Sequence, residues 1–200
     1  MEQQGIAGFD YKMTPKMMVD MPKAEYKGPI WLVNTKERAE EVARHLKRCR
    51  LLGFDTETRP SFKKGVVYKV SLLQLATYRE VYIFQLAKTG LPDSLIDILS
   101  NPRILKSGIA VKGDIKELQQ LKKFKPGGFV ELGDLTQQNK MKNHGLQGVA
   151  AVLLGKRISK KEQCSNWAKP NLTESQLQYA ATDAWIGREI YRHMSDRGWV

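Results

Sequence analysis

The chain has few residues of the kinds that build disulfide frameworks, zinc sites or membrane spans. Its two cysteines, Cys49 and Cys164, stand far apart and outside any C-x-x-C spacing, so neither a disulfide framework nor a cysteine zinc site is predicted. The three histidines, His45, His144 and His193, also lack ligand spacing. No apolar run approaches the roughly 18 residues of a membrane span, and the N-terminus lacks an apolar signal core. We expect a soluble protein of a reducing, cytoplasmic compartment with no membrane partner.

The charge is strongly one-sided. Lysine and arginine number 33 against 21 aspartate and glutamate residues, which gives a net charge of +12. Such an excess favours a polyanionic partner, nucleic acid or an anionic membrane surface. With 200 residues, of which 42% are hydrophobic, the chain is long enough for one domain with a substantial core.

The order of apolar patterns predicts a single α/β domain with a mixed β-sheet flanked by helices. Residues 1–28 show no sustained period and are predicted to be an arm, possibly flexible, whose methionines serve packing. Residues 29–200 form the domain. Its expected strands cover 30–33, 51–57, 67–76, 80–86, 103–107 and 130–132. Its expected helices cover 34–48, 92–99, 113–124, 135–142, 146–154 and, from a Thr173/Gln176 capping box, about 174–196.

The strand at 51–58 ends in a pair of acids. Asp55 and Glu57 are spaced i, i+2, which places both side chains on one face of a strand. Two adjacent carboxylates at the end of a buried strand are costly unless a positive group lies between them, and a divalent metal is the natural occupant. An Asp-x-Glu triplet is expected about once by chance in a chain of this size, so the pair alone does not establish a site.

Three further residues extend the acidic pattern. Tyr179 and Asp183 are i, i+4 neighbours on the final helix and share one of its faces, where small alanines would permit close packing on the sheet. Asp114 stands at the expected start of a helix, directly after a strand. Each of them singly also fits a plain structural role, a surface pair or an acid that favours the helix dipole.

Taken together, these motifs resemble the DnaQ-like 3′–5′ exonuclease superfamily, in the branch with tyrosine as fifth residue. Its three motifs correspond to Asp55-Thr56-Glu57, to Asp114 within Lys112-Gly113-Asp114-Ile115, and to Tyr179-Ala180-Ala181-Thr182-Asp183. The sister branch has histidine five residues before the last aspartate, where this chain has Gln178. The resemblance runs from Phe54 through the final helix and implies a ribonuclease H-like sheet.

The resemblance implies a two-metal site. Asp55, Glu57 and Asp183 would hold the ion that activates water, Asp55 would bridge to a second ion, and Asp114 would help through water. Hard oxygen ligands select Mg²⁺ or Mn²⁺, and no small-molecule cofactor is expected. Tyr179 would orient the attacking water, because an unperturbed tyrosine, with a pKa near 10, is a poor general base at neutral pH.

Basic residues near the motifs are the candidate nucleic-acid contacts. Lysine runs are usually solvated faces, but as a set these residues would bind phosphates without reading sequence. Trp167 is a candidate for stacking on a terminal base, although its context favours a packing anchor. The full set is Lys63, Lys64, Lys112, Lys156, Arg157, Lys160, Lys161 and Trp167.

The resulting expectation is a metal-dependent 3′–5′ exonuclease that releases nucleoside 5′-monophosphates. Ribonuclease D carries helical modules after its nuclease domain, whereas the resemblance here covers a nuclease domain alone. In that respect the chain is more similar to stand-alone nucleases that resemble the exonuclease domain of the Werner syndrome helicase. That favours DNA over RNA. The alternatives are ribonuclease D-type trimming of RNA 3′ ends and a catalytically silent nucleic-acid-binding module, and charge alone does not separate the three.

Overall fold

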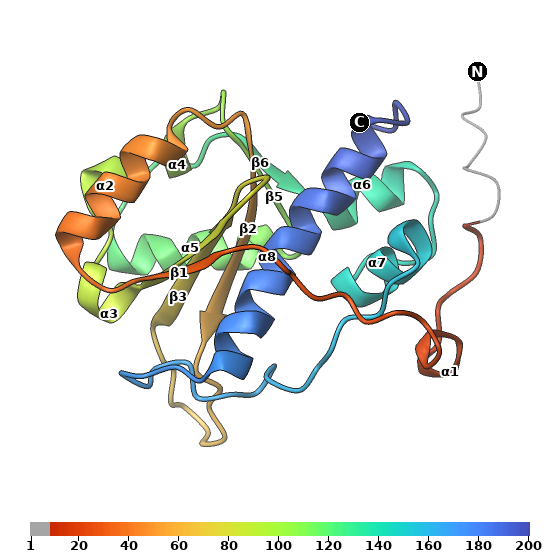
Figure 1. Cartoon of the computed structure of the whole chain (residues 1–200), viewed down its shortest axis with the longest axis horizontal. Coiled ribbons are helices and arrows are strands. Elements are labelled where there is room, and N and C mark those ends of the chain that lie inside the picture. Colours follow the sequence, from red (N-terminus) through yellow and green to blue (C-terminus); the bar gives the residue numbers. More distant parts are fainter. Residues whose placement is uncertain (1–8) are drawn as a thin grey trace.

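A six-stranded mixed sheet with helices on both faces forms the molecule (Figure 1). The computed structural model describes residues 9–200. The strand order is β1-β4-β3-β2-β5-β6. The strands are β1 (Ile30–Val33), β2 (Leu51–Thr58), β3 (Val70–Ala76), β4 (Val81–Gln85), β5 (Leu105–Gly108) and β6 (Phe129–Glu131). The predicted α/β class and mixed sheet are confirmed.

The central strand β2 pairs differently on its two sides. Its whole outer half pairs antiparallel with β3, with Asp55 opposite Gln74 and Glu57 opposite Leu72. On the other side β2 pairs parallel with β5 only from Leu51 to Gly53. Beyond Gly53, one edge of β2 therefore lies open beside the helix that follows β5.

One face of the sheet is covered by the helices α2 to α5. Their buried side chains join the even-numbered positions of β2, Leu52 and Phe54, in one apolar cluster. Phe54, on the face opposite the acids, is 1% exposed and packs edge-on against Phe129. These helices are α2 (Lys36–Leu46), α3 (Leu86–Thr89), α4 (Asp93–Ser100) and α5 (Val111–Leu121).

The long helix α8 (Glu174–Ser195) crosses the other face of the sheet (Figure 1). It begins at the predicted capping box, in which Thr173 and Gln176 bond each other's backbone N–H groups. Ala180, Ala181 and Ala184 are fully buried against the sheet, so the predicted small-residue face is confirmed. The helices α6 (Leu132–Gln138) and α7 (Leu146–Leu154) flank α8.

Close approach of α8 to β2 depends on a glycine. A Cβ atom added at Gly53 would overlap the carbonyl oxygen of Ala184 and lie 2.8 Å from its carbonyl carbon. Any larger residue at position 53 would push the helix outward. Gly53 is two residues from Asp55 in β2, and Ala184 directly follows Asp183, so this contact brings the two acidic elements together.

Some predicted boundaries differ from the structure. The helix α2 begins at Lys36 rather than at residue 34, because the Thr35 hydroxyl caps it by accepting the Arg38 N–H. The helix α5 begins at Val111, two residues earlier than predicted, after a left-handed Ala110. The helix α6 begins at Leu132 rather than Leu135. In both later cases the helix starts within three residues of the end of the short parallel strand, which apolar periodicity does not reveal.

The N-terminal arm lies on the domain from residue 9 onward. It includes the short helix α1 (Pro15–Met18), after which the chain passes across α8 to β1 (Figure 1). Tyr26 is 6% exposed, and its backbone N–H donates to the Thr182 hydroxyl on α8. Residues 9–28 of the predicted arm therefore lie on the domain, and residues 1–8 lie outside the described part. Met13 is buried, which fits the predicted packing role.

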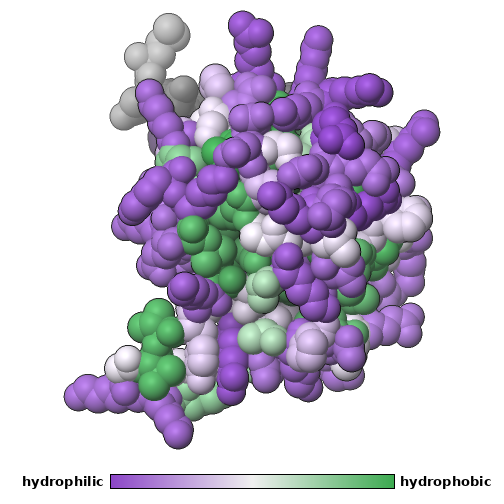
Figure 2. All heavy atoms as spheres, turned by 90° about the vertical axis from the view of Figure 1, so that its left-hand side faces the viewer, coloured by the Kyte–Doolittle hydropathy of each residue, from purple (hydrophilic) through white to green (hydrophobic). Residues whose placement is uncertain are grey.

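Hydrophilic side chains dominate the surface, with large apolar side chains exposed among them at several places. Figure 2 shows mainly hydrophilic atoms on the face that it presents, with apolar atoms projecting at its lower edge. The loop between β2 and β3 carries Phe62 and Val67, which are 86% and 85% exposed. Within residues 9–200, no helix combines the length and apolar character that a membrane crossing requires.

Candidate active site

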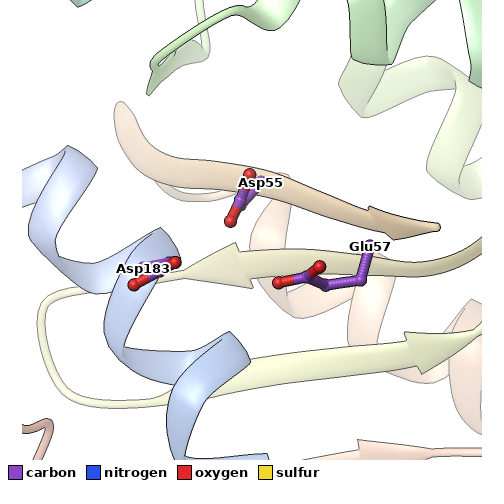
Figure 3. A group of neighbouring side chains, drawn as sticks. All are labelled: Asp55, Glu57 and Asp183. Atoms are coloured by element: carbon purple, nitrogen blue, oxygen red, sulfur yellow. The ribbon is translucent and has the colours of Figure 1, made fainter. Parts of the chain in front are cut away.

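Three carboxylates converge between β2 and α8. Oxygen atoms of Asp55, Glu57 and Asp183 all lie within 4.8 Å of one another. Figure 3 shows the first two side chains leaving the same face of β2 and pointing toward the third on α8. The strand period places the first two together, and the Gly53 contact brings α8 close enough for the third to complete the group.

Burial makes this group electrostatically costly. It raises the pKa of Asp55 well above its usual range, and the Asp183 and Asp114 carboxylates raise it further. Burial and the charge of Asp55 raise the pKa of Glu57 to about 10. Burial also raises the pKa of Asp183 to about 7, although a hydrogen bond from Tyr179 opposes that shift. The cluster thus holds negative charge poorly without a cation.

A divalent cation fits this donor set. One carboxylate oxygen of Asp183, Oδ1, is buried without a hydrogen-bond partner among the residues described. Oxygen-only donors at this spacing suit a hard ion, and a bound ion would both satisfy that oxygen and offset the charge repulsion. The predicted acidic metal cluster is therefore present for three of its four members.

Asp114 stands beside the group rather than in it. It lies in the first turn of α5, against the open edge of β2, and accepts a hydrogen bond of 2.7 Å from the Thr56 hydroxyl. Burial raises the pKa of Asp114 to about 6, while the Thr56 hydrogen bond lowers it. The predicted participation of Asp114 through water is compatible with this placement and stays a prediction.

Glu131 caps the helix that carries Asp114, a contact that the sequence did not reveal. Its carboxylate accepts hydrogen bonds from the backbone N–H groups of Ala110 and Val111, at 3.0 and 2.9 Å. These groups are at the start of α5, where unpaired N–H groups need acceptors. Because Glu131 is 20 residues further along the chain, no local capping pattern indicates this contact.

Tyr179 lies one helical turn before Asp183 and beside it. Burial raises the pKa of the Tyr179 phenol far above its usual value, and the charges of Asp183 and Glu57 raise it further. The group is therefore held protonated. A protonated phenol donates a hydrogen bond, which agrees with the prediction that Tyr179 orients water rather than acting as a general base.

Trp167 packs against the Tyr179 ring inside the protein. The prediction that Trp167 stacks on a terminal base is wrong. Its side chain is 1% exposed, and its ring centroid lies 5.8 Å from that of Tyr179. A ring so buried has no face available to a base. The packing role, which the sequence favoured, is the one observed.

The basic residues that we predicted to contact nucleic acid differ in how close they lie to the three carboxylates and in whether other side chains already engage them. Lys160 and Lys161 lie in a loop bordering two cavities that both reach Tyr179 and Asp183. Lys112 forms an exposed ion pair with Asp134, which weakens its case as a phosphate contact.

Lys156 lies over the Trp185 ring, and Arg157 donates from Nε to the Met21 carbonyl, so both are engaged in holding the fold. Lys63 belongs to the exposed loop after β2 and borders a separate cavity near Tyr68. Lys64 is exposed in the same loop. Nucleic-acid contacts at these positions stay predictions.

The comparisons with known proteins agree with this geometry. A family model described as 3′-5′ exonuclease matches residues 30–199. The chain belongs to this exonuclease family. That match covers both β2 and α8, the two elements that carry the three carboxylates.

Named relatives give the same result. The bifunctional 3′-5′ exonuclease/ATP-dependent helicase WRN of Mus musculus is 34% identical over 167 residues, which cover 80% of this chain and 12% of that protein. The Nibbler EXO domain of Aedes aegypti has a TM-score of 0.77 at 27% identity, covering 84% of this chain and 88% of that one. A Trypanosoma brucei RNase D complex with RNA U12 has a TM-score of 0.73 at 20% identity, covering 84% and 62%, and shows likeness of fold alone.

The chain spans 12% of the mouse relative and about half or less of several other curated relatives. The similarity is thus to an exonuclease domain. The resemblance predicted from the three motifs is confirmed, as is the enzyme class.

Proposed function

We propose that this exonuclease hydrolyses the terminal phosphodiester at nucleic-acid 3′ ends, with DNA favoured, by means of two Mg²⁺ or Mn²⁺ ions. The observation that carries the proposal is the buried convergence of Asp55, Glu57 and Asp183, in which the Oδ1 atom of Asp183 has no hydrogen-bond partner among the described residues. Asp55 would bridge both ions, and Asp114 would assist through water. Bound ions would neutralise the phosphate charge and lower the pKa of the attacking water.

The side chains of this protein have distinct parts in the reaction. The water oxygen forms the new bond to phosphorus, the bond from phosphorus to the 3′ oxygen breaks, and that oxygen leaves with a proton. The product is a nucleoside 5′-monophosphate. The Tyr179 hydroxyl would hydrogen-bond the water and hold it in line for attack, which reduces the entropy lost at the transition state. Trp167 holds the Tyr179 ring from behind.

The preference for DNA comes from the resemblance to the exonuclease domain of the Werner syndrome helicase, and the 34% identity to the mouse bifunctional exonuclease and helicase agrees with that resemblance. Trimming of RNA 3′ ends is the second candidate, favoured by the similarity in fold to an RNase D bound to RNA. A catalytically silent binding module is the third. Against it stands the presence of Asp55, Glu57, Asp183 and Tyr179 in one buried site, because a binder has no need to bury repelling carboxylates. The cytoplasmic location stays a prediction.

A labelled-oligonucleotide assay tests the proposal. DNA and RNA of one sequence, labelled at the 5′ end, are incubated with Mg²⁺, Mn²⁺ or EDTA. We expect a ladder that shortens from the 3′ end only with metal, faster for DNA, and nucleoside 5′-monophosphates as products. The matched control Asp55→Asn keeps the size of the side chain but loses its charge, and should abolish the ladder.

The outcomes separate the three candidates. A ladder on RNA alone assigns the trimming activity instead. Retained binding without shortening of either polymer establishes the silent module. Cleavage that persists in Asp55→Asn, or in EDTA, would refute the assignment of the metal ligands.

A further inference from the structure

The larger of the two cavities beside the active site has a wall that lies outside the family domain. This cavity, of about 590 Å³, reaches Tyr179 and Asp183 on α8. Its second wall comes from residues 142–148 at the start of α7, and its third from Lys12 to Met18 of the arm. The family match begins at residue 30, so the arm lies outside the matched segment. We call this cavity the arm groove.

The arm is fixed on both sides of α1. Before the helix, the Met13 N–H donates to Asn143 Oδ1 at 2.9 Å, and Asn143 Nδ2 donates to the Tyr11 carbonyl at 2.9 Å. Asn143 is 5% exposed, so this pair of bonds is shielded from water.

After the helix, the backbone of Arg157 exchanges hydrogen bonds with the arm. Its N–H donates to the Pro22 carbonyl at 3.0 Å, and its carbonyl accepts from Ala24 at 2.8 Å. Because hydrogen bonds hold the segments on both sides of α1, the arm forms a fixed wall of the groove.

The groove is positive. Lys12, Lys142 and Lys160 line it from three separate segments, and all three are exposed. Within residues 9–200 none of them forms an ion pair with a carboxylate, whereas other exposed lysines, such as Lys47 and Lys122, do. Asp183 is the sole acid lining the groove, at its catalytic end. Unpaired lysines around one cavity attract a polyanion.

The wall contributed by the arm is also partly apolar. Met13, Pro15 and Met18 line it alongside Lys12. At the opposite wall, the first N–H groups of α7 have no side-chain cap, since its N-cap residue is Gly145. A single nucleic-acid strand presents both phosphates and apolar base faces, while a duplex buries its bases in stacked pairs. The mixed lining therefore suits a single strand.

We propose that the arm groove binds the single strand leading to the scissile phosphate, with Lys12, Lys142 and Lys160 contacting its backbone phosphates. The arm would thereby extend the substrate site beyond the family domain. This inference rests on the proposed nuclease function but concerns strand binding, which can be measured without catalysis.

The salt dependence of binding tests the groove. The affinity of the full chain for a fluorescent single-stranded DNA of fixed sequence is measured in EDTA across a salt series. Each lost phosphate contact should reduce the slope of log K against log[salt] by about 0.7, equivalent to about fivefold weaker binding near 0.1 M salt. We expect this reduction for Lys12→Ala, Lys142→Ala and Lys160→Ala, and twice as much for Lys12→Ala with Lys160→Ala.

Lys16→Ala is the matched control. Lys16 is an exposed lysine of the same arm, in helix α1 and outside the groove lining, so removing it changes the net charge equally without removing a groove contact. Its slope should equal that of the unaltered protein. Thermal unfolding of every variant checks that the arm and domain remain folded, and a blunt duplex of the same sequence should bind more weakly than the single strand.

Several results would contradict the proposal that the arm groove binds a single strand. Equal slopes for Lys12→Ala and Lys16→Ala would show that the groove lysine adds nothing specific. Tighter binding by Lys12→Ala would mean that the arm obstructs the strand, and equal affinity for duplex would exclude single-strand selection. A failure of the proposed nuclease function would look different. The labelled oligonucleotides would not be shortened in the presence of metal, while the lysine substitutions would still weaken binding of the single strand.

Discussion

Substitution of Gly53 by alanine tests how the fold assembles the metal site. The added Cβ would lie 2.8 Å from the carbonyl carbon of Ala184, whereas ordinary contact begins at 3.4 Å. The helix α8 must therefore retreat from β2 by at least 0.6 Å at this point. Asp183 precedes Ala184 on the same helix turn and would move with it, away from Asp55 and Glu57.

The displacement has two measurable consequences. Overpacking of this kind costs about 1–3 kcal/mol, and each kcal/mol lowers the Tm of a domain of this size by about 2–4 °C. Metal sites tolerate ligand shifts of about 0.2 Å, so the affinity for Mn²⁺ should fall on the order of 10–100-fold. Calorimetric titration with Mn²⁺ and thermal unfolding with and without the ion measure both.

Gly113→Ala is the matched control. An added Cβ there meets nothing within 4 Å, and the position is inside α5, where alanine is favoured over glycine by up to about 1 kcal/mol. This variant should unfold at an equal or higher temperature. If Gly53→Ala instead keeps the Tm and the Mn²⁺ affinity of the unaltered protein, the account of the β2 and α8 contact is refuted.

Three other predictions follow from buried polar groups. Tyr179→Phe should lower turnover strongly while leaving Mn²⁺ and DNA affinity nearly unchanged, because only the water-orienting hydroxyl is lost; full activity in single-turnover assays would contradict the role. The pKa values of Glu57 and Asp183 are raised, so in EDTA the folded protein binds more protons than the unfolded chain between pH 5 and 8. The Tm in EDTA should therefore fall as the pH rises through this range. Saturating Mn²⁺ should reverse this fall. A Tm that rises with pH in EDTA, measured by calorimetry, would invert the assigned sign. Lys106→Met should destabilise the protein by about 1–3 kcal/mol, because the buried Lys106 ammonium donates to the carbonyls of Ile98, Asn101 and Ile104 and methionine leaves them unsatisfied; an unchanged urea midpoint would show that water replaces it.

Local sequence determined the parts of the site that depend on one element. The i, i+2 spacing of Asp55 and Glu57 is enough to put them on one face of a strand, and the i, i+4 spacing of Tyr179 and Asp183 does the same on a helix. The capping box at Thr173 likewise marked the start of α8, because its hydrogen bonds are local. The family motifs tied these pieces to one another in the right order.

Only the tertiary structure decided what depends on contacts between distant segments. The separation of Asp114 from the three converging carboxylates reflects its bond to Thr56 and the capping of α5 by Glu131. The burial of Trp167 reflects packing from β3, β4 and α8. The arm meets Asn143 across 130 residues. Sequence periodicity reports which face of an element is buried, but it carries no information on which distant segment covers that face.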